Sequence, residues 1–276
     1  MSHRRLRLER LEDRRLLSLA PWGADFAPDS YTGGSHRTFP QCPAPAAAIS
    51  PTGAFVLVWT AADRDGSGDG VYARCFDSQG APAGASFRVN TTTISDQHFP
   101  AVAMDAAGNF VITWSSLLQD GSGYGVYARL YQADGTPRGD EFRVNTHTFD
   151  NQNFSAAAMD AAGNFVVVWT SQGQDGDRAG IFGRRFDAAG TPRGGEFQVN
   201  LTTASNQRYP SVAMDTTGAF TVTWTSQDQD GSGGGIYARR YGPDGAPLGG
   251  EILVNTTTLG NQQLSAVAIG AGGYAV

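Results

Sequence analysis

The chain has 276 residues, of which 40% are hydrophobic and 11% aromatic, a composition typical of a folded protein and unlike that of a disordered one. Its 20 basic residues are all arginine, which excludes mechanisms that need a lysine, such as Schiff-base chemistry. The formal net charge is −6 and no run approaches about 18 apolar residues, so we expect neither a nucleic-acid partner nor a membrane span.

The first 20 residues form a basic segment rich in Leu and Arg, RRLRLERLEDRRLLSLA at 4–20. The segment could form one amphipathic helix. It differs from a standard secretion signal, because no uninterrupted apolar core of about 7–15 residues follows the basic part and three acids intrude. We interpret residues 1–20 as a targeting-type segment.

Residues 21–45 are either a linker or a degenerate strand that closes the fold. The stretch GADFAPDSYT (23–32) weakly matches GASFRVNTTT (84–93), six residues out of register with the rest of the chain. The two cysteines, Cys42 and Cys75, are too few for a disulfide framework. A single bridge between them and two free thiols are both open.

The rest of the chain is built from a repeat of 55 residues. Four successive copies, at 46–100, 101–155, 156–210 and 211–265, align without insertion or deletion, and a partial fifth occupies 266–276. Anchor residues recur at this spacing: Ile49, Met104, Met159, Met214 and Ile269, with Trp59, Trp114, Trp169 and Trp224. A period of this size is typical of solenoids, propellers and arrays. We interpret 46–276 as one propeller-like repeat domain, and the chain as a piece of a longer array.

The residue pattern of each copy predicts four short antiparallel strands. The second copy illustrates this pattern. A small apolar strand at 101–105 is followed by one at 110–115, whose Phe, Ile and Trp share a face. In the first and third copies the opposite face of this strand is also apolar, so it must be covered on both sides. A third strand at 126–131 and a fourth at 141–145 follow, joined by the turn 134–139.

Four antiparallel strands and one large aromatic residue in about 55 residues are typical of a propeller blade. An immunoglobulin-like sandwich would need about 100 residues and seven strands. The sequence therefore predicts an all-β protein, a β-propeller-like array of four-stranded antiparallel blades. Stacked independent hairpin sheets are the alternative, and the number of blades stays open.

The loop after the second strand holds the candidate metal ligands. In the first copy it reads DRDGSGDG, and Asp63, Asp65 and Asp69 alternate around glycines. Alternating carboxylates on a tight turn are ligands that calcium prefers. The bidentate Glu that ends a calcium loop is absent, so a plain Asp-Gly hairpin turn is the alternative. These three residues are our candidate calcium site, and we assign no catalytic residue.

One arginine recurs on the third strand of every copy: Arg74, Arg129, Arg184 and Arg239. A ring of guanidinium groups could form an anion-binding mouth suited to carboxylated sugars. We favour instead an arginine that packs on Tyr or Phe and pairs with a neighbouring Asp, because repeated charges in repeat proteins usually serve contacts between units.

The turn after the first strand also carries a recurrent acid, at Asp105, Asp160 and Asp215. Its sequence, MDAAGNF in the second copy, resembles the sialidase Asp-box, S-x-D-x-G-x-T-W. It lacks the serine and has a different spacing to Gly and Trp. Asp-boxes are structural turns, so we expect these residues to hold the turn.

Two further resemblances concern location. LEDRRLLS (11–18) resembles the LEPR-XLL-type motif, L-E-x-R-x-L-L-S, at the start of very large bacterial surface or secreted proteins, with Asp13 in place of the usual Pro. Over nearly all of 46–276, the copies resemble the FVVVWTSQGQDG-type repeats common in such proteins. Both resemblances imply export and an extracellular or cell-surface location, and neither implies a reaction.

We therefore expect a non-enzymatic, exported repeat scaffold for binding or adhesion at the bacterial cell surface, assisted by calcium, with a protein or glycan as its ligand. This hypothesis rests on near-uniform copies, none of which is specialised for catalysis. The alternative is a carbohydrate-active propeller, sialidase- or glycoside-hydrolase-like. A cluster of acids and Tyr from different copies around one pocket would favour that alternative.

Overall fold

A computed structural model describes Asp29 and residues 35–37, 46–270 and 273–276. Residues 1–20 and Cys42 lie outside the described residues, so whether Cys42 is bridged to the buried Cys75 stays open. Within the described part of the chain all regular structure is β-strand, which confirms the all-β prediction. No helix there is long and apolar enough to cross a membrane.

Each of the four copies forms one antiparallel sheet in which the strands follow one another in chain order. The inner strand of each later sheet begins in the last four residues of the preceding sequence copy, so His98, which belongs to the first copy by sequence, lies on the inner strand of the second sheet. The strands of the first copy are β1 (His36–Arg37), β2 (Ala47–Ile49), β3 (Phe55–Ala62), β4 (Asp69–Phe76) and β5 (Phe87–Arg88). Those of the second are β6 (Gln97–Met104), β7 (Phe110–Leu117), β8 (Tyr124–Tyr131) and β9 (Phe142–Arg143). Those of the third are β10 (Gln152–Met159), β11 (Phe165–Gln172), β12 (Ala179–Phe186) and β13 (Phe197–Gln198).

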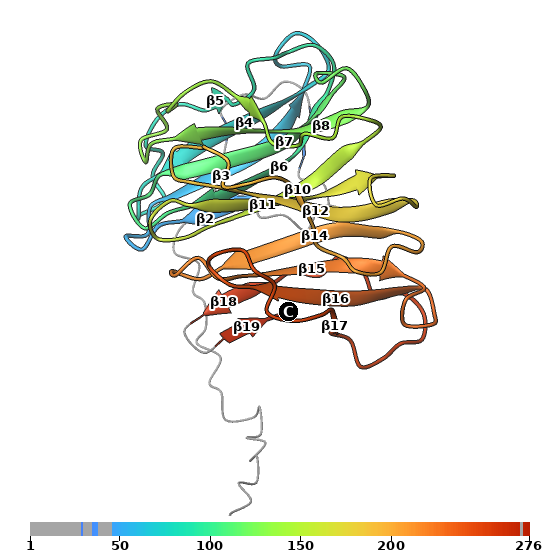
Figure 1. Cartoon of the computed structure of the whole chain (residues 1–276). Coiled ribbons are helices and arrows are strands. Elements are labelled where there is room, and N and C mark those ends of the chain that lie inside the picture. The colour runs from blue at the N-terminus through green and yellow to red at the C-terminus, as the bar shows by residue number, and fades with distance from the viewer. Residues whose placement is uncertain (1–28, 30–34, 38–45, 271–272) are drawn as a thin grey trace, which may run out of the picture.

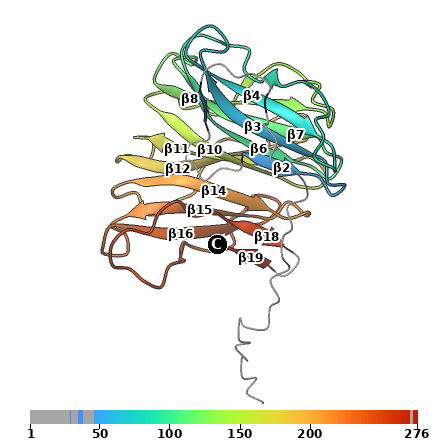
Figure 2. The same ribbon diagram turned by 180° about the vertical axis from the view of Figure 1, so that it is seen from behind.

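The fourth copy repeats the pattern, and the partial fifth forms a two-stranded hairpin. Their strands are β14 (Gln207–Met214), β15 (Phe220–Gln227), β16 (Gly234–Tyr241), β17 (Ile252–Leu253), β18 (Ala268–Gly270) and β19 (Gly273–Ala275). Figures 1 and 2 show the sheets stacked in chain order, from the blue and green first copies to the red last one. This arrangement is the predicted β-propeller-like array of blades.

The core lies between neighbouring blades, because the second strand of each copy is buried on both faces. In β7, Phe110, Ile112 and Trp114 pack against the first copy. Val111, on the opposite face of β7, packs against the third copy. Burying one such side chain contributes about 1.5–3 kcal/mol, so each blade is stabilised mainly by its two neighbours.

The first and fourth strands differ from their predicted bounds. The first strand of the second copy begins at Gln97 instead of position 101, and its pairing with β7 shifts between His98 and Ala101. This bulge places Phe99 at φ 54°, a region that bulky residues rarely adopt. The fourth strand keeps only two residues, Phe142 and Arg143. Period-two alternation carries no signal for a bulge, which explains the missed start.

The first copy builds its innermost strand from two pieces, β1 and β2, which both pair with β3. In the second copy Gln97 pairs with Ser116, whereas in the first copy His36 pairs with Ala61. Ser116 and Ala61 are 55 residues apart, and Gln97 and His36 are 61 apart, so the chain ahead of β2 holds six extra residues. This is the offset seen in the sequence of 23–32.

Candidate functional site

The two ends of the inner strands carry different side chains. The inner strands β6, β10 and β14 lie side by side. Where they end, the Asp-containing turns of successive copies meet around a cavity of about 380 Å³, lined by Ile49, Met104, Met159 and Met214. Where they begin, loops from neighbouring copies meet, and the side chains are polar and aromatic. We call this second side the loop end.

The recurrent acids at the turn end hold their own turns. Asp105 Oδ1 accepts hydrogen bonds from the backbone nitrogens of Ala107 (2.9 Å) and Asn109 (2.8 Å). Asp160 does the same in the third copy. In the fourth copy, a hydrogen bond from the Thr217 side chain lowers the pKa of Asp215. These carboxylates are therefore structural, as the sequence predicted.

The recurrent arginines on the third strands join neighbouring blades. The Arg129 guanidinium lies 5.8 Å from the Tyr131 ring centroid and donates to the carbonyl of Val89 in the preceding copy (3.2 Å). Arg184 and Arg239 make the equivalent contacts. The predicted packing on an aromatic ring is present, while backbone carbonyls take the place of the expected Asp partner.

The three candidate calcium ligands have different surroundings. Asp63 has φ 55° and its backbone nitrogen donates to Gly68 O at 2.7 Å, which closes the loop. Asp65 Oδ2 accepts from Asn90 Nδ2 at 3.1 Å. Only Asp69 belongs to a group of three potential metal-binding side chains among the described residues, and its companions are Asp96 and His98.

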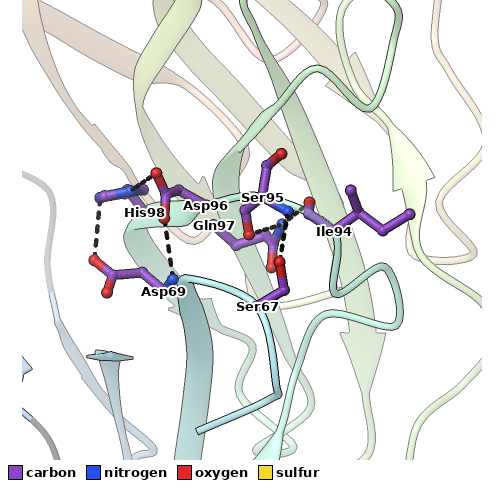
Figure 3. Close-up of polar contacts among 7 residues, drawn as sticks. All are labelled: Ser67, Asp69, Ile94, Ser95, Asp96, Gln97 and His98. Carbon is purple, nitrogen blue, oxygen red and sulfur yellow. Dashed lines mark hydrogen bonds and ion pairs between the residues drawn. The ribbon is translucent and has the colours of Figure 1, made fainter. Parts of the chain in front are cut away.

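Asp69, Asp96 and His98 form the candidate functional site, which we call the acidic site. His98 lies between the two carboxylates: Nδ1 is 3.7 Å from Asp69 Oδ2, and Nε2 is 3.6 Å from Asp96 Oδ2 (Figure 3). One potential ligand atom from each residue lies within 4.8 Å of the other two. The Asp69 and His98 side chains are 12% and 16% exposed, whereas that of Asp96 is 39% exposed. The site is therefore most open to solvent at Asp96.

Hydrogen bonds between two loops set this geometry. Asp96 Oδ1 accepts from the backbone nitrogen of Asp69 at 3.1 Å, which turns its second oxygen toward His98 (Figure 3). The backbone nitrogen of Ser95 donates to Ser67 Oγ at 3.3 Å. Buried Asn90 holds both loops, because it accepts from the Val71 nitrogen (2.8 Å) and donates to Asp65. The same Asn recurs in each copy with the same bonds, so the frame belongs to the repeat.

Aromatic rings border the acidic site. The Tyr124 ring from the second copy meets the His98 ring edge-on at 5.9 Å. Burial, and then the negative charges of Asp96 and Asp69, raise the pKa of Tyr124. The ring centroid of Phe99 lies 5.4 Å from that of His98. The site is thus enclosed by residues of two copies.

A row of aromatic side chains leads away from the site along the loop end. The ring centroids of Phe99 and Phe154 are 4.6 Å apart, and those of Phe154 and Tyr209 are 5.0 Å apart. All three residues occupy the bulge of their inner strand, with φ between 54° and 58°. A positive φ is unfavourable for such residues, so the packing around them must maintain it. We call these three residues the aromatic row.

The acidic site exists in one copy only. At the position of Asp69 the later copies have Tyr124, Ala179 and Gly234. At the position of Asp96 they have Asn151, Asn206 and Asn261, and at that of His98 they have Asn153, Arg208 and Gln263. Asp96 and His98 were not among the residues predicted from the sequence. The signal that could have found them is a set of three aligned positions that become ionisable together in the first copy.

Solved structures similar to this chain are propeller-type proteins. The α-L-arabinanase of Penicillium chrysogenum, complexed with arabinobiose, is 13% identical, with a TM-score of 0.56 over 84% of this chain and 72% of that one. A thermostable family-43 glycoside hydrolase is 12% identical, with a TM-score of 0.51 over 90% and 84%. A Hadza microbial sialidase is 10% identical, with a TM-score of 0.53, and the match spans 78% of this chain and 46% of that one. No protein-family model and no curated protein matches the chain.

These findings correct two of our predictions. We expected a non-enzymatic scaffold for binding or adhesion, because the copies looked uniform. That prediction was wrong: similar folds occur in an arabinanase, a glycoside hydrolase and a sialidase, and one copy is specialised at Asp69, Asp96 and His98. The absence of an enzymatic role was predicted on the same ground and is wrong for the same reason. The residues that build the strands are nearly the same in all copies, and our prediction overlooked that the positions of Asp69, Asp96 and His98 vary.

Proposed function

We propose that this chain is a carbohydrate-active protein that binds a glycan across the loop end and cleaves it at the acidic site. The observation that carries the proposal is the acidic site itself, where one copy places two carboxylates around an imidazole. The arabinanase, glycoside hydrolase and sialidase folds support a carbohydrate ligand.

The aromatic row supports a sugar ligand. Sugar rings present flat C–H faces that pack on aromatic side chains, and their hydroxyls hydrogen-bond to polar side chains nearby. Phe99, Phe154 and Tyr209 are all half-buried, and each follows a polar residue: His98, Asn153 or Arg208. This alternation of ring and polar group suits an extended oligosaccharide.

The acidic site has the groups that glycosidic cleavage needs. Asp96 is the more exposed carboxylate and would act as the nucleophile, with His98 as proton donor to the leaving oxygen. Asp69 would orient the imidazole through Nδ1. With Asp96 as nucleophile, cleavage would pass through a glycosyl-enzyme, which a water deprotonated by His98 then releases. We therefore expect retention at the anomeric carbon.

The same side chains could hold a divalent cation. One imidazole nitrogen with two carboxylates suits zinc or manganese better than calcium, which prefers oxygen ligands. A bound cation would take the place of the proton on His98 and fix the three side chains. Activity that is lost with a chelator and restored by zinc or manganese would assign the site to a metal.

The test is release of reducing ends from arabinan, arabinoxylan and pectin by the full chain. We expect Asp96→Asn and His98→Asn to lower turnover roughly 100-fold or more, because each removes a group that acts on the substrate. The matched controls are Asn151→Ala and Asn153→Ala, which change the equivalent positions of the second copy. Circular dichroism melts check that every variant is folded.

The proposal fails if the wild-type chain neither binds nor cleaves any glycan of the panel. It fails also if the Asp96 and His98 variants keep the turnover of the Asn151 and Asn153 controls.

We propose further that the protein is exported, and that residues 1–20 direct it. This rests on the resemblance of LEDRRLLS (11–18) to the motif of large secreted proteins. Deletion of 1–20 should retain the protein inside a bacterial host that otherwise releases or displays it. An unchanged distribution between cells, surface and medium would contradict the proposal.

A further inference from the structure

A second distinctive pocket lies at the loop end, where the fourth copy meets the segment that follows it. Its volume is about 210 Å³. It is the counterpart of the acidic site: Gly234 stands where the first copy has Asp69, Asn261 where it has Asp96, and Gln263 where it has His98. The inner strand β14 contributes Arg208 and Tyr209 to the lining. We call this cavity the Arg208 pocket.

Gly234 lines the pocket at the position that Tyr124 occupies in the second copy. A Cβ atom at Gly234 would lie 3.1 Å from Gln262 O and 3.2 Å from Thr225 Cγ2, so the backbone is closely packed at this point. The Tyr124 ring packs on His98, whereas Gly234 presents no ring to Arg208, which holds the position equivalent to His98.

Arg208 gives the pocket a positive charge. It is the one arginine at a position that holds His98, Asn153 and Gln263 in the other copies. Its side chain is half-buried, and among the described residues no carboxylate forms an ion pair with it. A half-buried guanidinium without a protein anion is suited to an anionic ligand.

The remaining lining fits a sugar. Asn206, Gln227 and Asn261 supply amide donors and acceptors, and Tyr209 supplies a ring face. Tyr209 is also the last member of the aromatic row that begins at Phe99 beside the acidic site. One extended ligand could therefore contact both the acidic site and the Arg208 pocket.

We propose that the Arg208 pocket is a binding subsite for the carboxylate of an acidic sugar, so that the ligand of the loop end is a glycan containing uronic acid. This deepens the proposed function and rests on it for the identity of the loop end as a glycan surface. Arg208 would pair with the sugar carboxylate, Tyr209 would stack on the ring, and the amides would bind its hydroxyls.

The test is calorimetric titration of the full chain with tri-galacturonate and with the same trisaccharide after its carboxyl groups have been reduced. We expect Arg208→Gln to weaken binding of the acidic trisaccharide roughly tenfold to a hundredfold, and to change binding of the reduced one little. Added salt should weaken binding of the acidic trisaccharide and leave binding of the reduced one unchanged. Arg138→Gln is the matched control, because it removes the same charge from an exposed turn.

The proposal is overturned if Arg208→Gln binds tri-galacturonate as tightly as the wild type and the Arg138 control do. It is overturned equally if the reduced trisaccharide binds as tightly as the acidic one, or if neither binds. The titrations are repeated in His98→Asn, which lacks the proposed proton donor. Binding that persists there without turnover supports the subsite independently of cleavage. If Arg208→Gln leaves tri-galacturonate binding unchanged while the wild type still cleaves neutral glycans, the subsite fails and the proposed function stands.

Discussion

The acidic site and the Arg208 pocket occupy the same place in the repeat, but they differ in the charge of their side chains and in the space that those side chains leave open. In both, the residue at the position of Asp96 accepts from a backbone nitrogen of the third strand: Asp96 from Asp69 at 3.1 Å, and Asn261 from Gly234 at 3.0 Å. In the first copy the frame holds two acids and an imidazole. In the fourth it holds a cavity beside Arg208. The blade therefore provides a constant backbone on which three positions determine charge and space.

A carboxylate from the next copy holds the loop ahead of the acidic site. Glu141 of the second copy accepts from the Thr91 nitrogen (2.6 Å), the Thr92 hydroxyl (2.7 Å) and Gln119 (2.8 Å). Glu196 and Glu251 hold the loops of the second and third copies in the same way. We call the loop at Thr91 and Thr92 the tied loop, and its fixed position can keep the like charges of Asp69 and Asp96 close together.

The largest effect is expected when the three acidic-site residues of the first copy are replaced by the residues that stand at the same positions in the fourth copy. The triple variant Asp69→Gly, Asp96→Asn, His98→Gln should lose glycan turnover by a factor of roughly 100 or more, because no group remains to transfer a proton. Its melting temperature should stay within a few degrees of the wild type, since the frame tolerates these residues in the fourth copy. Reducing-end assays and thermal melts measure both. Turnover within a few-fold of the wild type would show that the acidic site does no chemistry.

A smaller effect is expected from alanine substitutions at Gly66 and Gly68 of the first copy. Both have positive φ, so alanine costs about 1 kcal/mol of unfolding free energy at either position. A Cβ at Gly68 would also collide with Asp96 Oδ1, while one at Gly66 would have no atom within 4 Å. Gly68→Ala should therefore lower turnover roughly tenfold beyond Gly66→Ala, as measured by urea unfolding and kinetics. Equal turnover in the two variants would mean that the position of Asp96 is unimportant.

A third effect concerns pH and the tied loop. Burial favours the protonated form of Glu141, but hydrogen bonds from Thr91, Thr92 and Gln119 outweigh it and lower the pKa of its carboxyl. A lowered pKa in the folded state contributes stability that is present above the pKa of the unfolded chain and is lost as pH falls through the folded value. Glu141→Gln should cost about 1 kcal/mol at pH 7 and progressively less toward pH 3. Urea unfolding across this range measures it, with exposed Asp140→Asn as control, and a pH-independent difference would contradict the explanation.

The smallest effect concerns local opening of the tied loop. Amide hydrogen exchange at Thr91 and Thr92 should be roughly tenfold faster in Glu141→Gln than in the wild type, because both amides donate to the Glu141 carboxylate. The amides of Leu201 and Thr202, which donate to Glu251, should exchange at the same rate in both proteins and serve as the control. Unchanged exchange at Thr91 and Thr92 would show that Glu141 does not restrain the loop.

Much of the fold was predictable from sequence because it depends on local patterns. Alternation in Phe110, Ile112 and Trp114 specifies one buried face, and the apolar residues between them specify the other. Repetition at 55 residues then implies that each face meets an identical neighbour. The bulge at Phe99 was not predictable, because a single extra residue with positive φ leaves no trace in an alternating pattern.

The candidate site was only partly predictable. Asp69 stood out in an acidic loop, but Asp65 in the same loop turns away to Asn90, while Asp69 meets Asp96 and His98 from the next loop. By itself the sequence determined the repeat, the strands and the buried faces, because these follow from side-chain periodicity along one strand. Only the tertiary structure decided which acids meet a histidine and where a glycine lines a pocket. Those outcomes depend on how two loops, each tied to buried Asn90 or its equivalents, are brought together by neighbouring blades.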